Sequence, residues 1–329
     1  MKLVILCPFG VRTGGPEAQY QLSDMLLQQG FDAYFWLLTD PDLATLRDFV
    51  RNGQNLSSIQ LNIPERANAV EDYRRYRIRP FPQYNPHERM LFIVPEIYVW
   101  LLPLLLPQQV MIWWLSVDNA FRPLSEVNSN FLRLPLVHHA AQSEFALRFV
   151  RALGVSGSML SDYSVVELPP DLPALGDRPK TVAICAGHKI SVNLDPLCQQ
   201  IAERCPEANV VRIANMSKAD VCAVLAQARV FVDLGKFPGK DRMVREALLL
   251  GANPIIANCG AGAISQDFPV PPMYRVDPLA SANIAALCGH MLEYPEAHAP
   301  HFAAFRNDVA AEKSRFAAEV LQTFSGFIA

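Results

Sequence analysis

The fold is decided by residues 232–256, VDLGKFPGKDRMVREALLLGANPII. A short apolar run ending near Leu234 leads into a loop of glycines, one proline and several charges. A helical pattern follows over residues 243–251, and a second apolar run begins at Pro254. Short apolar runs that alternate with helical patterns are typical of βαβ units. This segment therefore predicts a parallel sheet with helices packed on it.

The same alternation extends in both directions along the chain. In the second half we expect strands at residues 181–185, 209–213, 230–234 and 254–257, helices at 195–205, 218–227 and 243–251, and a helical tail at 299–327. In the first half we expect strands at 2–7, 33–38, 91–94, 110–115 and 136–141, a strand edge at 159–160, and helices at 17–29 and 143–153. A further helix is predicted to start with Asp40 as N-cap and Pro41 at its first position, and residues 62–89 are predicted to be a loop or insertion.

These patterns predict an α/β protein with two Rossmann-like domains. Residues 166–179 hold four prolines and are the best linker candidate. We therefore expect an N-terminal domain at 1–165, a second domain at 180–300, and a C-terminal helix at 301–329 that packs back on the first domain. Open parallel sheets bind ligands at the carboxyl ends of their strands. We accordingly expect the two domains to face each other across a cleft.

Composition excludes several classes of function. The chain has 329 residues, of which 51% are hydrophobic and 19% charged, with a net charge of −3. It can bury a sizeable core, and it lacks the basic surplus that nucleic-acid binding needs. No apolar run approaches the ~18 residues of a membrane span. Seven scattered cysteines without a C-x-x-C pair predict free thiols and no zinc site.

We therefore expect a cytoplasmic protein without a secretory signal. The basic and aromatic run at residues 73–79 leaves open a peripheral contact with a membrane or with an anionic acceptor, beside the simpler alternative of a solvated face. The oligomeric state is not predicted.

Two loops of the first half carry candidate site residues. Gly14 and Gly15 follow the first strand, where glycines allow a ligand to approach the backbone and a helix N-terminus can bind an anion. The alternative is a tight turn in which Glu17 merely caps the helix. Asp118 follows a later strand, where a carboxylate can serve as a general base or orient a sugar hydroxyl. The alternative there is an Asx turn. Glu17 and Asp118 are the candidate catalytic carboxylates.

The second half supplies basic candidates. Lys189 lies in the loop Gly187-His188-Lys189 after the strand at 181–185, where a lysine can neutralise a diphosphate. Lys240 and Arg242 lie at a predicted helix N-terminus, which is typical of phosphate binding. Arg242 and Glu246 are spaced i,i+4, so a salt bridge within the helix is the alternative.

The run REALLLGANPII at residues 245–256 resembles the donor-site segment of GT-B glycosyltransferases, in which a glutamate opens an E-A-x-x-x-G-x-P-V-I stretch. The Gly14-Gly15 loop and the helix that ends at Gly30 resemble the N-terminal element of the same family. The resemblance implies that Glu246 binds the donor ribose. It also implies that Lys189, with Lys240 or Arg242, holds the donor diphosphate.

Two departures from the family's pattern bear on mechanism. Pro238 stands where the family has a second glutamate, and Asp118 stands where many relatives have a histidine. A retaining mechanism is therefore not implied, and an inverting one with Asp118 as base stays open.

Together these features predict a metal-independent glycosyltransferase without a cofactor. It would move sugar from a nucleotide-sugar donor to a saccharide acceptor in surface polysaccharide biosynthesis. Lys240, Arg242 and Glu246 are expected to share one crevice with the Gly14-Gly15 turn, and together these donor-binding residues would wrap the nucleotide diphosphate. Two alternatives remain: a nucleotide-sugar 2-epimerase of the same fold, and a non-catalytic nucleotide- or sugar-binding subunit. The proline at position 238 favours the second of these.

Overall fold

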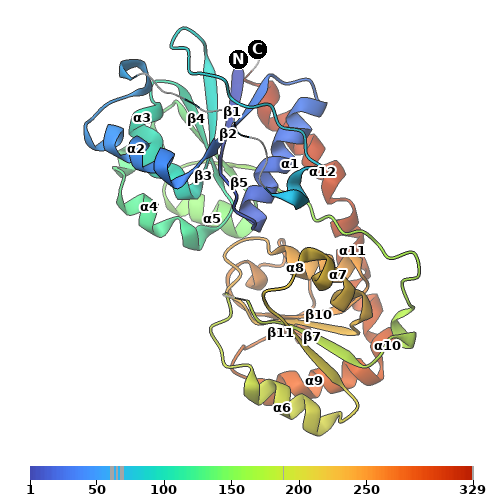
Figure 1. Cartoon of the computed structure of the whole chain (residues 1–329). Helices are drawn as coiled ribbons and strands as arrows, with labels where there is room; N and C mark the ends of the chain where they lie inside the picture. Colours follow the sequence, from blue (N-terminus) through green and yellow to red (C-terminus); the bar gives the residue numbers. More distant parts are fainter. Residues whose placement is uncertain (60–62, 64–65, 67–69, 188, 328–329) are drawn as a thin grey trace. The chain divides into compact units, whose positions relative to one another are not determined.

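The computed structural model describes residues 1–59, 63, 66, 70–187 and 189–327. The chain divides into two compact units, shown in Figure 1. Unit 1 consists of Met1–Asp162 together with Ser314–Ala329, and unit 2 consists of Tyr163–Lys313. Each unit contains one sheet in which every pair of neighbouring strands is parallel, as the alternating pattern predicted.

The sheet of unit 1 has the strand order β2-β1-β3-β4-β5-β6. Its strands are β1 (Lys2–Pro8), β2 (Ala33–Leu38), β3 (Met90–Pro95), β4 (Gln109–Trp114), β5 (Val137–Ala141) and β6 (Ser158–Met159). Its helices are α1 (Gly14–Gln28), α2 (Asp40–Arg51), α3 (Leu102–Leu105), α4 (Phe121–Ser125) and α5 (Glu144–Ala152), with 3-10 turns that include η3 (Glu96–Leu101) and η4 (Val117–Asn119). The strands are almost wholly buried because helices cover both faces of a parallel sheet.

Alternate strand residues supply a hydrophobic core cluster of unit 1. Val4, Phe92 and Trp114 point to one face and pack with residues of η3, α2, α3 and α5. Residues between them, such as Ile5 and Trp113, are equally buried and belong to the opposite side of the pleat. The two-residue period of a strand thus explains how one apolar run contributes side chains to the cores on both faces of the sheet.

Two helix starts differ from the sequence prediction. Helix α1 begins at Gly14 with Thr13 as N-cap, so both glycines lie in the first helical turn and not in a preceding loop. Helix α2 has Thr39 as its N-cap, not Asp40. The Thr39 hydroxyl accepts the Asp42 N–H, and the Asp42 carboxylate accepts the Thr39 N–H. This reciprocal capping box makes Thr39 the N-cap, one residue before the predicted N-cap Asp40.

The sheet of unit 2 has the strand order β11-β10-β9-β7-β8. Its strands are β7 (Thr181–Cys185), β8 (Asn209–Ile213), β9 (Val230–Asp233), β10 (Asn253–Ala257) and β11 (Arg275–Val276), and its helices are α6 (Asp195–Arg204), α7 (Lys218–Gln227), α8 (Arg242–Leu249), α9 (Ser281–Glu293), α10 (Pro295–His298) and α11 (Ala303–Ala310). Helices α7 and α8 cover one face and α6 and α9 the other (Figure 1). The sequence analysis did not predict α9 or β11.

The predicted helical tail is broken into several helices, of which the last is α12 (Glu312–Ser325). Residues Ser314–Ala329 belong to unit 1. There the Gln29 side chain donates to the Ala317 carbonyl at 2.7 Å, and the Phe324 ring lies edge-on to Phe31. Figure 1 shows α12 beside α1 in this unit.

The predicted linker, residues 166–179, lies within unit 2. Arg178, which is buried, donates to the carbonyls of Ala228 and Leu250 at 2.9 and 2.8 Å. Within the described ranges, no helix is long and apolar enough to cross a membrane.

Candidate functional site

Strand order marks one place in each sheet where a ligand site is expected. In unit 1 the chain leaves β1 to form β2 on one side and then β3 on the other. In unit 2 it leaves β7 to form β8 on one side and then β9 on the other. Loops at such a reversal diverge and leave a crevice at the carboxyl ends of the strands. The loops after β1, β3, β7 and β9 are therefore the first to consider.

In unit 2, an ion pair joins the loop after β7 to the start of α8. The Lys189 ammonium lies 2.5 Å from the Asp241 carboxylate, and 41% of the Lys189 side chain is exposed. Burial lowers the pKa of Lys189, but the charge and hydrogen bond of Asp241, together with the charge of Asp233, outweigh burial, and the net pKa is raised. Lys189 is thus a cation at neutral pH with a partly exposed head at the predicted crevice. His188 of the same loop lies outside the described residues.

The pKa values of two carboxylates beside Lys189 are shifted in opposite directions. Asp233 ends β9, is almost fully buried, and accepts the Gly235 N–H at 2.9 Å. Burial, reinforced by the charge of Asp241, raises the pKa of Asp233 to about 7. For Asp241, burial acts in the same direction, but Lys189, the Met243 N–H and Arg245 lower its pKa. The sequence analysis did not single out Asp233, although it lies at a strand end beside a Gly-rich loop.

The loops after β9 and β10 pack backbone to backbone. The Ala261 N–H donates to the Phe237 carbonyl at 2.8 Å. Gly260 has φ +52°, and a Cβ atom built there would lie 2.3 Å from the carbonyl oxygens of Lys236 and Phe237. Only glycine fits this position without a backbone shift. The close approach fixes the course of the loop that leads to α8.

Lys240 is buried in a charge cluster with the C-terminal helix. Its ammonium lies 2.9 Å from the Glu312 carboxylate, which is fully buried. The Arg245 guanidinium donates to Glu312 at 2.8 Å and to the Lys240 carbonyl at 2.9 Å. Glu312 also accepts the Ser164 N–H at 3.1 Å. Lys240 in the loop before α8 and Arg245 on α8 therefore neutralise Glu312, a partner that local sequence patterns did not reveal.

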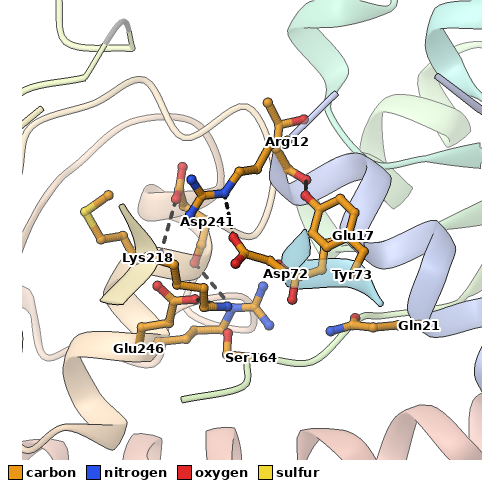
Figure 2. A network of polar contacts seen from close by, with 12 residues as sticks. Arg12, Glu17, Gln21, Asp72, Tyr73, Ser164, Lys218, Asp241 and Glu246 are labelled. Carbon is orange, nitrogen blue, oxygen red and sulfur yellow. Dashed lines mark hydrogen bonds and ion pairs between the residues drawn. The ribbon is translucent and has the colours of Figure 1, made fainter. Parts of the chain in front are cut away.

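The other two candidates of this segment lie on α8. Arg242 is its first residue and is buried. Glu246 lies one turn further on, and its carboxylate is 3.4 Å from the Lys218 ammonium of α7. Figure 2 shows Asp241, Lys218 and Glu246 together on this side of unit 2. The structure thus places Glu246 near the carboxyl edge of the sheet, with only about a tenth of its side chain exposed.

In unit 1, Glu17 is held by the basic and aromatic run. Its carboxylate accepts hydrogen bonds from the Arg75 guanidinium and the Tyr76 hydroxyl, both at 3.0 Å. The Tyr73 hydroxyl donates to the Thr13 carbonyl at 2.9 Å, next to Gly14 (Figure 2). This run therefore packs against the start of α1 and is hydrogen-bonded to it.

Further ion pairs hold the same run in place. Arg77 pairs with Asp24 at 2.9 Å and Arg79 with Asp32 at 2.8 Å. Arg12, in the loop after β1, pairs with Asp72 at 2.6 Å (Figure 2). Arg74 pairs with Glu71 at 2.7 Å, so each of the four arginines in the run has a carboxylate partner. Fewer charges therefore remain for an external anion than the sequence suggested.

Asp118 lies on η4 and is exposed at the carboxyl edge of the unit 1 sheet. Gly15 faces the same loop, since a Cβ atom built there would lie 3.8 Å from a Leu115 methyl. A carboxyl group that the sequence analysis did not select, Glu96, follows β3 and is 3% exposed. Its side chain accepts the Leu115 N–H at 2.9 Å, and burial raises its pKa to about 7. The structure brings Gly15, Glu96 and the Asp118 loop together.

The described part of the chain contains no group of three or more His, Cys, Asp or Glu side chains arranged to hold a metal ion.

The chain matches no sequence family model and no curated protein sequence, but it resembles solved structures along its full length. Sucrose-phosphate synthase from Thermosynechococcus elongatus has a TM-score of 0.64 at 11% identity, covering 100% of this chain and 99% of that one. HepE from Anabaena, in complex with UDP-glucose, has a TM-score of 0.61 at 12% identity, covering 99% and 100%. The lipopolysaccharide outer core galactosyltransferase WaaB has a TM-score of 0.58 at 11% identity, covering 97% and 99%. These likenesses, together with the two parallel sheets, show that the chain has the two-domain Rossmann-like fold of GT-B glycosyltransferases.

Proposed function

We propose that this protein is a glycosyltransferase that moves a sugar from a nucleotide-sugar donor to a saccharide acceptor. The observation that carries the proposal is the partly exposed Lys189 at the strand-order reversal of unit 2, in a fold shared with HepE, which was solved with UDP-glucose. A cation at this point can neutralise a diphosphate leaving group as its charge develops.

On the donor side we assign Lys189 to the diphosphate and Glu246 to the ribose hydroxyls. Binding a diphosphate would draw Lys189 from Asp241, which keeps Arg245 and the Met243 N–H as neighbours. Arg242 is a second candidate contact at the start of α8. Lys240, paired with buried Glu312, would act through the course of the loop and not through its own charge.

On the acceptor side we assign Asp118 to orient or deprotonate the acceptor hydroxyl, because it is exposed at the carboxyl edge of the sheet. Glu17 is the second carboxylate to test. Arg75 and Tyr76 donate hydrogen bonds to it and hold it in place. The anomeric configuration of the product, measured by NMR, decides between inverting and retaining transfer.

We further propose that the acceptor is a saccharide of a surface polysaccharide, a role for which WaaB is the precedent. The reaction would be cytoplasmic and independent of metal. The seven cysteines are thiols and not disulfides, in line with a reducing compartment. Activity unchanged by a chelator would support the metal-free reaction, and its loss and recovery with added Mg²⁺ or Mn²⁺ would refute it.

The test is to incubate the protein with UDP-, GDP-, ADP- and CMP-sugars, with and without saccharide acceptors. We expect release of free nucleotide only when an acceptor is present. Nucleotide release with an altered sugar and no acceptor would instead identify a 2-epimerase. Calorimetric binding without turnover would identify a binding subunit, and no binding to any nucleotide would remove the proposal.

A further inference from the structure

Glu96 and Asp233 are equally buried carboxyl groups, each at the carboxyl edge of its sheet. Glu96 is the first residue after β3, with 3% of its surface exposed. One carboxylate oxygen accepts the Leu115 N–H at 2.9 Å. The Ser116 backbone and the Asn119 side chain also lie near this carboxylate and lower its pKa. These three groups belong to one segment, residues 115–119, here called the exit turn.

The register of the sheet explains why the Glu96 side chain lies against the exit turn. Strands β3 and β4 are parallel, with Pro95 paired to Trp113. Glu96 therefore leaves its strand beside the point where the chain leaves β4. Beyond that point the sheet no longer supplies acceptors for backbone N–H groups, and a buried N–H without an acceptor is costly. The Glu96 carboxylate supplies the acceptor that a neighbouring strand would otherwise provide for the Leu115 N–H.

We propose that Glu96 is a positioning residue that fixes the exit turn and thereby sets where Asp118 meets the acceptor. This inference rests on the proposed function, because it concerns the residue assigned to the acceptor hydroxyl. Asp118 lies within the exit turn, on η4 between the segment's Ser116 and Asn119 contacts. Glu96 itself does not contact the substrate and acts through the turn.

The chemistry of the site supports a positioning role over simple packing. Burial raises the pKa of Glu96 to about 7, although the N–H donors act in the opposite direction. An apolar side chain would fill the same space without the cost of a buried carboxyl, but it would leave the Leu115 N–H without this acceptor. The ionised carboxylate accepts more strongly than the neutral acid, so the turn is held most firmly above neutral pH.

The first experiment measures hydrogen exchange of a peptide spanning residues 114–120 in the full chain. In Glu96→Gln, an amide NH₂ replaces one acceptor oxygen, and we expect exchange about tenfold faster or more, as for loss of a hydrogen bond to a charged group. Glu88→Gln is the matched control, because Glu88 precedes β3 at the opposite end and pairs with Lys2. It should leave this peptide unchanged. Equal protection in wild type and Glu96→Gln would overturn the proposal.

The second experiment separates positioning from a general structural effect. We expect Glu96→Gln to lower kcat/KM for the acceptor about tenfold while the Kd for the donor nucleotide stays constant. Glu96→Asp, which keeps the charge, should recover part of the loss. In wild type, kcat/KM for the acceptor should rise through about pH 7, and Glu96→Gln should lack this step. An unaltered pH profile in the variant would contradict the assignment.

Two further outcomes keep the tests independent. If Glu96→Gln does not fold, exchange of the same peptide in wild type, corrected for intrinsic rate, should be slower at pH 8 than at pH 6, and the reverse order would overturn the proposal. If wild type neither binds nucleotides nor turns over, the proposed function fails. The exchange data then still decide whether Glu96 fixes the exit turn.

Discussion

At the scale of single residues, some charged side chains are buried in ion pairs, and others are exposed enough to bind a ligand. Lys240 and Lys189 looked equivalent in the sequence, as basic residues in loops that follow strands. The structure buries Lys240 against Glu312 and leaves Lys189 partly exposed beside Asp241. Glu312 is far from Lys240 in sequence, so no local pattern could have revealed the pair. The loop positions were predictable, whereas the partners of the charged side chains were not.

Replacing Lys189 tests the donor side. We expect Lys189→Ala to weaken binding of the donor's nucleoside diphosphate about tenfold or more, because a charge-assisted hydrogen bond to phosphate is lost. Lys180→Ala is the control, since Lys180 precedes β7 at the other end of the strand and pairs with Glu207 and Glu293. Isothermal calorimetry measures both. Equal affinities for the two variants would remove Lys189 from the site.

Replacing Glu312 tests the buried charge cluster. Glu312→Ala leaves Lys240 and Arg245 buried without their carboxylate, which costs about 3–5 kcal/mol of unfolding free energy. Denaturant unfolding measures it, with Glu203→Ala on the exposed side of α6 as a control that should change stability by less than about 0.5 kcal/mol. The triple change Lys240→Met, Arg245→Met, Glu312→Leu should recover much of the loss. A small effect of Glu312→Ala would show that the cluster is not needed for stability.

The raised pKa of Glu96 predicts a specific dependence of stability on pH. Between its ordinary value of 4.5 and about 7, folded Glu96 holds a proton that the unfolded chain has released. The folded state binds more protons there, so this group makes the unfolding free energy fall as pH rises through that interval. Glu96→Gln removes the contribution. The variant should therefore gain stability relative to wild type between pH 4.5 and 7, measured by urea unfolding, and a constant difference would refute the raised pKa.

At the scale of elements, periodic patterns were predictable and boundaries set by side-chain contacts were less so. The strands β2, β7 and β8 and the helix α7 match their predicted ranges because their apolar residues follow one period between clear breaks. Helix α2 starts one residue before its predicted first turn because Thr39 and Asp42 bond reciprocally. Helix α9 was missed, since small residues dominate it and its apolar face is weakly marked.

The close contact between the loop that follows β9 and the loop that follows β10 gives a prediction at this scale. Gly260→Ala places a Cβ atom 2.3 Å from two carbonyl oxygens at a positive φ, so the loops must separate. We expect a loss of at least about 2 kcal/mol in unfolding free energy. Gly289→Ala is the matched control: it lies within α9 with no atom within 4 Å of the added carbon, and it should stabilise by about 0.5–1 kcal/mol. Thermal unfolding of both variants compares them, and similar melting temperatures would contradict the close packing.

At the scale of the whole molecule, the chain completes unit 1 with residues from its far end. Phe316, Val320 and Phe324 recur at every fourth position of α12 and are fully buried. The last segment therefore belongs to the core of unit 1, although the rest of that unit ends at Asp162. The sequence predicted a returning helix through its mild amphipathic pattern. Which of its residues join unit 1 depends on contacts with α1 that a sequence pattern does not specify.

This division predicts that damage to one unit spares binding by the other. Phe324→Ala removes a buried ring that contacts Phe31 and should cost about 3–5 kcal/mol. Hydrogen exchange should rise in β1 and α1, while the affinity for the donor nucleotide, whose contacts we assign to unit 2, should change less than about twofold. The exposed Leu321→Ala on the same helix is the control and should alter neither. Because each unit has a core of its own, its local stability is set mainly by its own contacts. If Phe324→Ala abolished nucleotide binding in a chain that remained folded, the assignment of donor binding to unit 2 alone would be wrong.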